Sequence, residues 1–207
     1  MKIDQKSAFR ISCAFVLLVG TEIAVLSPAI FRSNIAARSQ RTIALAKAKQ
    51  IHIGLCEYAI DHDGVFPAAT SHSNDAFRQL DSPRDSDRLY VVTGSRWSEM
   101  ASGRGKANLG RGENHWAYAS GLNNGSKGNL PLVMDGFSDT IGVYIDDPTR
   151  RGGVWRREAA IIVRADGSAK MEKPEADGRV YEMKSGRPVD IFSKEYGTDP
   201  GQLLNPW

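Results

Sequence analysis

Cysteine is nearly missing from this chain of 207 residues, which contains only Cys13 and Cys56. Cys13 falls within an apolar run and Cys56 within a helical pattern, so we do not expect the two to pair. Neither a disulfide scaffold nor a cysteine-ligated metal site can be built from them. The small disulfide-stapled domain is therefore excluded as a class.

A strong charge of either sign is also lacking, because the net charge is only +3 and the basic residues are spread along the sequence. A nucleic-acid-binding protein usually gathers its basic residues on one surface. The content of 41% hydrophobic and 25% charged residues is that of a globular protein. We expect one modest folded domain with an additional segment, and no nucleic-acid partner.

Motifs of catalysis are absent as well. The histidines form no His-x-x-x-His or Glu-x-x-His pair, and no serine lies in a Gly-x-Ser-x-Gly frame. The glycine-rich stretch 103–114 lacks the Gly-Lys-Ser/Thr of a phosphate loop. The sequence therefore predicts neither an enzyme nor a histidine metal site.

A long apolar run is present, from Ile11 to Phe31, with only four polar residues among its 21. It is long enough to cross a hydrocarbon core of about 30 Å as a helix. We expect residues 1–10 in the cytoplasm, a transmembrane helix over 11–31 and an exported C-terminal part. A cleaved signal peptide is the alternative, but the run exceeds the usual length of about 7–15 residues for a signal peptide's apolar region.

Glu22 lies near the middle of this run. An ionised group there costs about 2.5–3.5 kcal/mol on insertion scales. In one interpretation Glu22 pairs with a positive group on a neighbouring copy of the helix. In the other it is a protonated or tolerated residue of an otherwise apolar segment.

Residues 32–61 predict an amphipathic continuation of the same helix. Apolar residues recur in steps of three, four and seven and draw a stripe along one side; they are Ala37, Ala44, Ala48, Ile51, Leu55 and Tyr58. The helix is expected to end in "DHDG" (61–64), because glycine favours the left-handed C-terminal position and Pro67 cannot continue a helix.

Residues 62–172 carry the signals of a small antiparallel sheet. Strands are predicted within 89–94, 115–121, 130–136 and 159–172, the last being a hairpin that turns at Asp166-Gly167. Residues 173–207 are expected to form an irregular tail, with a marginal strand or hairpin within 178–192. The predicted fold class is α+β, a long N-terminal transmembrane-to-soluble helix packed on this sheet.

The segment "AKAKQIHIGLCEYAIDHDGVFP" (46–67), following a long apolar helix, resembles the type IV pilin-like proteins and the pseudopilins of type II secretion. The stretches 73–80, 89–99, 115–137 and 159–172 resemble pilin-like proteins of planctomycete and verrucomicrobial bacteria. One departure is that Glu22 lies two residues after Gly20, whereas the family's prepilin peptidase motif places its glutamate five residues after the cut.

The resemblance implies a structural protein of the bacterial inner membrane with a pilin-like domain in the periplasm. It would assemble through its N-terminal helix with copies of itself or with other pilin-like subunits, in a type II secretion or type IV pilus-like system. In the family, the glutamate to which Glu22 would correspond pairs with the N-terminal amine of a neighbouring subunit.

An acidic cluster raises the question of calcium, which some major pseudopilins bind in a C-terminal loop; its residues are Asp135, Asp139, Asp146 and Asp147. Oxygen ligands from a loop suit this ion, although exposed acidic turns are the commoner explanation of such a cluster. Two other classes stay open: a membrane-tethered periplasmic module that binds a sugar or a peptide, and a hydrolase built on the acidic cluster.

Overall fold

The structure is a computed structural model that describes residues 35–80, 89–93, 95–99 and 109–207. It divides into two compact units, Met1–Arg41 and Thr42–Trp207, and the second contains the fold described below. The predicted segments 1–10 and 11–31, with Glu22, lie outside the described residues. Within the described ranges, no helix has the length and apolarity that crossing a membrane requires.

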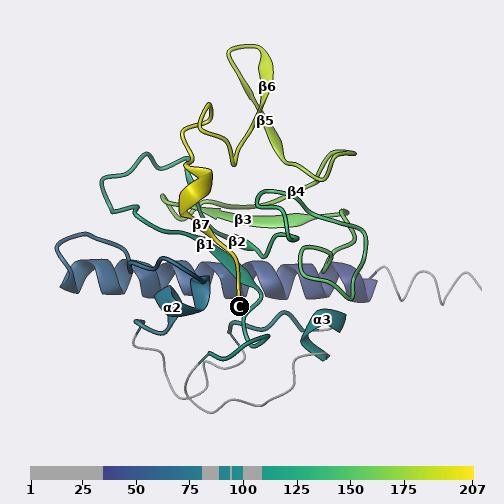
Figure 1. The fold of residues 1–207 in the computed structure, drawn as a ribbon, viewed down its shortest axis with the longest axis horizontal. Helices are drawn as coiled ribbons and strands as arrows, with labels where there is room; N and C mark the ends of the chain where they lie inside the picture. Colours follow the sequence, from purple (N-terminus) through teal and green to yellow (C-terminus); the bar gives the residue numbers. More distant parts are fainter. Residues whose placement is uncertain (1–34, 81–88, 94, 100–108) are drawn as a thin grey trace, which may run out of the picture. The chain divides into compact units, whose positions relative to one another are not determined.

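The amphipathic helix is confirmed over residues 35–61. In the second unit its apolar stripe is buried at Ala44, Ala48, Ile51 and Leu55, each at most 1% exposed. Tyr58 is only half-buried, because it lies at the border of the stripe and its hydroxyl donates to Gln79 Oε1 at 3.3 Å. The sequence pattern therefore identified the buried face of the helix, which runs alongside the sheet (Figure 1).

The helix ends where "DHDG" predicts it. The amide of Gly64 donates to the carbonyl of Ala59 at 2.8 Å, and Asp63 and Gly64 both have left-handed backbones, with φ of 53° and 81°. The ring of His62 stacks on Tyr58, and its Nδ1 donates to the Tyr58 carbonyl at 2.7 Å. These contacts satisfy carbonyls that the last helical turn leaves unpaired.

A five-stranded antiparallel sheet packs on this helix, in the order β4-β3-β2-β1-β7. Its strands are β1 (Trp116–Ala119), β2 (Pro131–Asp135), β3 (Ala160–Arg164), β4 (Ala169–Glu172) and β7 (Leu203–Leu204). The strands predicted within 115–121 and 130–136 and the hairpin of 159–172 are confirmed. An α+β fold with one long helix and an antiparallel sheet is thus established.

The strand predicted within 89–94 is wrong. Its described residues 89–93 form turns, and the short helix α3 (Arg96–Glu99) follows. The carbonyls of this segment serve other partners: Tyr90 accepts from the amide of His115 at 2.9 Å, and Val91 accepts from Lys47 Nζ at 2.7 Å. Its β-branched residues are used for packing, since Val92 is fully buried.

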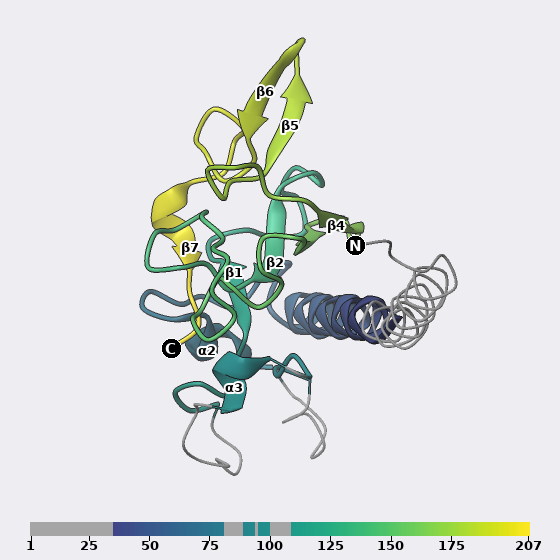
Figure 2. The ribbon, with the colours of Figure 1, turned by 90° about the vertical axis from the view of Figure 1, so that its right-hand side faces the viewer.

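Both faces of the sheet are covered. On one face Ile161 and Val163 pack in the same cluster as Ile51 and Leu55 of the helix. On the other, Ala160, Ile162 and Met134 pack with a C-terminal group that includes Val189, Ile191, Phe192 and Tyr196. Figure 2 shows the helix nearly end-on on one side and the hairpin of β5 (Tyr181–Lys184) and β6 (Arg187–Asp190) on the other. This double coverage explains why β1, β2 and β3 are buried at every position.

Residues 173–207 are therefore more regular than the irregular tail that the sequence suggested. The hairpin predicted within 178–192 is confirmed as β5–β6, and β7 adds to the edge of β1 with Leu204 opposite Tyr118. Asn205 then accepts from the amide of Phe137 at 2.8 Å and donates to the carbonyl of Ser138 at 3.0 Å. The C-terminal segment is a structural layer of the domain.

The helix–sheet contact supplies a test of the fold. We expect Leu55→Ala to lower the free energy of unfolding by about 2–5 kcal/mol, because it removes a fully buried side chain and leaves a cavity. Ile53→Ala is the matched control, since Ile53 is 56% exposed on the same helix, and it should cost less than about 1 kcal/mol. Urea unfolding followed by tryptophan fluorescence measures both. Equal costs would contradict the assigned helix face.

Candidate assembly surface

The helix also exposes apolar residues on the side away from the sheet, where they alternate with the exposed polar residues Lys49, Gln50 and Glu57. Ile53 lies two residues from Leu55, which is about 200° around the helix, and it is 56% exposed. Ile60 is 81% exposed and Ala46 is also exposed. Residues 46, 53 and 60 are seven apart, so they form one line along the helix. We call this line, with Ile43 beside it at 46% exposure, the outer helix face.

The outer helix face was visible in the sequence but was not singled out there. A helix with one apolar stripe needs one partner, and a helix with two opposite stripes needs two. The sheet covers the first stripe, and the outer helix face remains in solvent within the part of the chain that the structure describes. Isolated exposed apolar residues are common and need no partner, whereas a line of them along one helix offers apolar surface that a neighbour can bury.

The acidic residues proposed for calcium are not assembled into one site. Asp139 pairs with Arg150 at 2.6 Å, and Asp146 pairs with Arg157 at 2.6 Å. Asp147 Oδ1 accepts from the amide and the hydroxyl of Thr149. Among the described residues, no three histidine, cysteine, aspartate or glutamate side chains are placed to hold a metal ion together. The arginine-rich stretch 150–157 was the sequence signal for these ion pairs.

Asp135, the fourth acidic residue, is buried at the end of β2 with 3% exposure. Its Oδ2 accepts from Trp155 Nε1 at 2.9 Å and from the amide of Ile161 at 2.7 Å, while Oδ1 has no hydrogen-bond partner among the described residues. Burial raises the pKa of this carboxyl to about 7, against the lowering effect of its two donors. Asp135 thus anchors the loop that contains Trp155 to the sheet.

A cleft of about 500 Å³ lies beside this loop; it is lined by Asp146, Arg156, Arg157, Glu158, Lys173, Pro174, Glu175 and Ala176. Arg156 and Arg157 both have left-handed backbones, with φ of 52° and 53°, which are costly for residues other than glycine. Arg157 is held by Asp146 and by the Ala176 carbonyl, to which Nη1 donates at 2.6 Å. The cleft therefore presents fixed charges of both signs.

The histidines and the described cysteine do not form a reactive centre. Cys56 Sγ lies 3.7 Å from His52 Nδ1, but burial, and then the charge of Glu57, raises the pKa of the thiol and disfavours the thiolate. His115 is 2% exposed and packs edge-on against Trp97, and burial lowers its pKa to about 3. A neutral, enclosed histidine is a packing residue.

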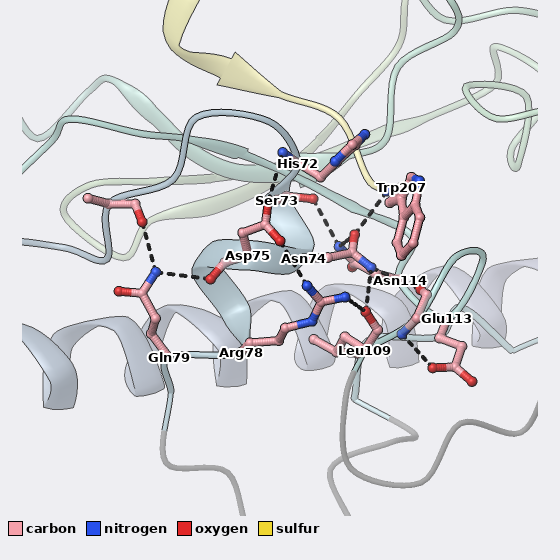
Figure 3. A network of polar contacts seen from close by, with 12 residues as sticks. His72, Ser73, Asn74, Asp75, Arg78, Gln79, Leu109, Glu113, Asn114 and Trp207 are labelled. Carbon is pink, nitrogen blue, oxygen red and sulfur yellow. Dashed lines mark hydrogen bonds and ion pairs between the residues drawn. The ribbon is translucent and has the colours of Figure 1, made fainter.

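A polar network around the helix α2 (Ser73–Phe77) is structural too (Figure 3). Buried Asn114 donates to Ser73 Oγ at 2.9 Å and to Asn74 Oδ1 at 3.1 Å. Asn74 in turn donates to the carbonyls of Leu109 and Gly110 and accepts from the amide of Trp207 at 2.9 Å. The polar groups of these residues satisfy one another's hydrogen-bonding capacity. The network thereby joins α2, residues 109–114 and the C-terminal segment.

Comparison of the chain with protein-family models, with curated proteins and with solved structures finds no match.

Asp135 predicts a pH dependence of stability. In the unfolded chain the carboxyl of Asp135 has its ordinary pKa of 3.8, whereas in the folded protein its pKa is about 7. The unfolded state therefore binds fewer protons between these values, and the stability contribution of Asp135 falls as pH rises from about 4 to about 7. Asp166 and Asp177, whose pKa values are lowered mainly by hydrogen bonds to Ser168 and Tyr181, oppose this trend at the acidic end.

The comparison with Asp135→Asn isolates this residue, because the amide cannot ionise and its oxygen can still accept from Trp155 and Ile161. We expect the stability of the variant relative to the parent to rise by on the order of 2–4 kcal/mol between pH 4.5 and pH 7.5. Urea unfolding at a series of pH values measures the difference. Parallel pH profiles would show that Asp135 has an ordinary pKa.

Proposed function

We propose that this protein is a membrane-anchored pilin-like, or pseudopilin-like, structural subunit that assembles through its N-terminal helix. The observation that carries the proposal is the outer helix face: one side of the helix is used by its own domain, and isoleucines line the other. A subunit that packs against neighbours through its helix needs this second side. The proposal places the apolar run 11–31 in the bacterial inner membrane and the domain in the periplasm.

The energetics favour such an assembly. Burying apolar surface stabilises by about 25 cal/mol per Å², so Ile53 and Ile60 contribute when a neighbouring helix covers them. The run 11–31 would move from lipid into a helical bundle, where packing against other helices replaces lipid contact. Glu22 would pair with a positive group of a neighbouring subunit in a type II secretion or type IV pilus-like system. Its function is assembly, and catalysis has no part in it.

The outer helix face gives the test of this function. We expect Ile53→Glu to reduce the yield of cross-links between full-length copies in membranes several-fold, because it places a charge where apolar contact is required. Glutamate is a good helix former, so the domain should keep its melting temperature. Met183→Glu is the matched control, since Met183 is 70% exposed on β5, away from the helix.

A lysine-reactive cross-linker suits both variants, because neither changes a lysine. Cross-linking by Ile53→Glu at the level of the parent protein would overturn the proposed assembly through the helix. Equal losses in both variants would overturn it too, since the effect would then not depend on the outer helix face.

A second candidate function is favoured by the cleft at Arg156 and Arg157. The backbone of these two arginines is held in a costly conformation, and the cleft offers charges of both signs, which suits a zwitterionic ligand such as a peptide better than a neutral sugar. This binding module would be tethered by the same N-terminal helix. It is a separate proposal from assembly.

Calorimetric titration with the dipeptide Lys-Glu tests the binding module. Saturable binding that Arg156→Ala weakens at least tenfold is the result expected of a binding module. No heat of binding up to millimolar dipeptide, or binding that Arg156→Ala leaves unchanged, would remove the support that the cleft gives to this function. Lys194→Ala, an exposed basic residue outside the cleft lining, is the matched control.

A further inference from the structure

The strand β4 forms an edge of the five-stranded sheet, opposite the edge that β7 covers. Figure 2 shows β4 at the margin of the sheet, with no described strand beyond it. Lys170 and Met171 are exposed, Met171 to 43%. An edge strand presents a row of backbone amides and carbonyls that another strand can pair with.

The register of β4 on β3 determines which of its backbone groups point outward. The amide of Arg164 donates to the carbonyl of Ser168, and residues two apart repeat this pairing, so Lys170 and Glu172 bond to β3. The amide of Ile161, opposite Met171, points the other way and donates to Asp135. The backbone groups of Ala169 and Met171 therefore face outward.

The side chains of β4 have a charge pattern that complements itself. Lys170 and Glu172 lie on one face of the strand, separated by Met171 on the other face. Neither Lys170 nor Glu172 forms an ion pair with another residue of the described ranges. When the sequence Lys-Met-Glu pairs antiparallel with a copy of itself, centred on the methionine, the lysine of each strand lies opposite the glutamate of the other.

We propose that β4 pairs edge to edge with β4 of a second copy of this chain, antiparallel and centred on Met171. Each Met171 then lies opposite the Met171 of the other copy, and the two exchange backbone hydrogen bonds. Lys170 of each copy lies opposite Glu172 of the other, which gives two symmetric ion pairs. The two sheets become one continuous sheet across a two-fold axis.

The charges of β4 favour this register over the alternative registers. If one strand shifts by two residues in one direction, Lys170 lies opposite Lys170 of the other copy. If it shifts by two residues in the other direction, Glu172 lies opposite Glu172 of the other copy. Like charges directly opposite each other destabilise a strand pair. A shift by one residue would place a residue whose backbone groups bond to β3 opposite a residue whose backbone groups face outward. The two strands could then not form a regular ladder of hydrogen bonds.

The interface is small, because it involves a strand of four residues. Interfaces below about 1,200 Å² are typical of weak or transient association. The pairing is thus expected to be weak between copies that are free in solution and stronger between copies that are held close together. It uses a different surface from the outer helix face and does not rest on the proposed assembly through the helix.

Disulfide trapping tests the pairing. In full-length protein with Cys13 and Cys56 replaced by serine, Met171→Cys should give a disulfide-linked dimer on mild oxidation, because paired residues of this type have Cα atoms about 5.5 Å apart. Met183→Cys is the control at another exposed methionine. Dimer formation by Met171→Cys no faster than by Met183→Cys would overturn the proposal.

Charge exchange tests the register. Adding Lys170→Glu to Met171→Cys should slow dimer formation several-fold, because two acidic side chains then face each other on both sides of the axis. Adding Glu172→Lys as well restores the complementary pairs and should restore the rate. If the single exchange has no effect, or the double exchange fails to rescue while both variants melt like the parent, this register is wrong. Loss of cross-linking in Ile53→Glu would not change either result.

Discussion

Burial of the helix stripe on one face of the sheet is the contact on which the rest of the domain depends. Ile51 and Leu55 are fully buried there, in the same cluster as Ile161 and Val163 of β3. In proteins most of the stability of an amphipathic helix comes from packing of its apolar face, and a sheet with an apolar face gains stability when a helix packs against it. The helix covers the apolar face of the sheet, and the sheet covers the apolar stripe of the helix. We therefore expect both elements to lose stability without this contact.

The same contact requires a second layer on the far face of the sheet, because β3 is apolar on both faces. The C-terminal segment provides that layer and is fixed to the sheet by an ion pair between a buried arginine and a half-buried glutamate. Arg164 of β3 is 5% exposed, bonds to Glu182 of β5, and donates to Tyr196 Oη at 2.9 Å. Without the hairpin, the buried charge of Arg164 would lose its partner. The sheet and the β5–β6 hairpin therefore stabilise each other through this pair.

The sequence predicted the elements whose signals are periodic. The helix stripe, its end at Asp63 and Gly64, and the hairpin at Asp166-Gly167 follow from local rules that tertiary contacts reinforced. The strand β7 escaped prediction because two residues, Leu203 and Leu204, carry no period. Asp135 was grouped with the acidic cluster, and only the three-dimensional arrangement shows that its carboxyl accepts from Trp155 and from the amide of Ile161. The ion pairs of Asp139 and Asp146 were not foreseen for a related reason: their arginine partners lie 11 residues further along the chain.

The second side of the helix follows from the same rules that predicted the first. Once the sheet covers the stripe at Ile51 and Leu55, Ile53 and Ile60 have to face away from it, since a residue two places along a helix lies on the opposite side. A chain that needed only a folded domain would place polar residues there at no cost to packing. Isoleucine at these positions adds nothing to the described fold, and exposed apolar surface is a liability in solution. The proposed assembly through the helix would supply a neighbour that covers this face, and would give these isoleucines a physical role that the single domain does not.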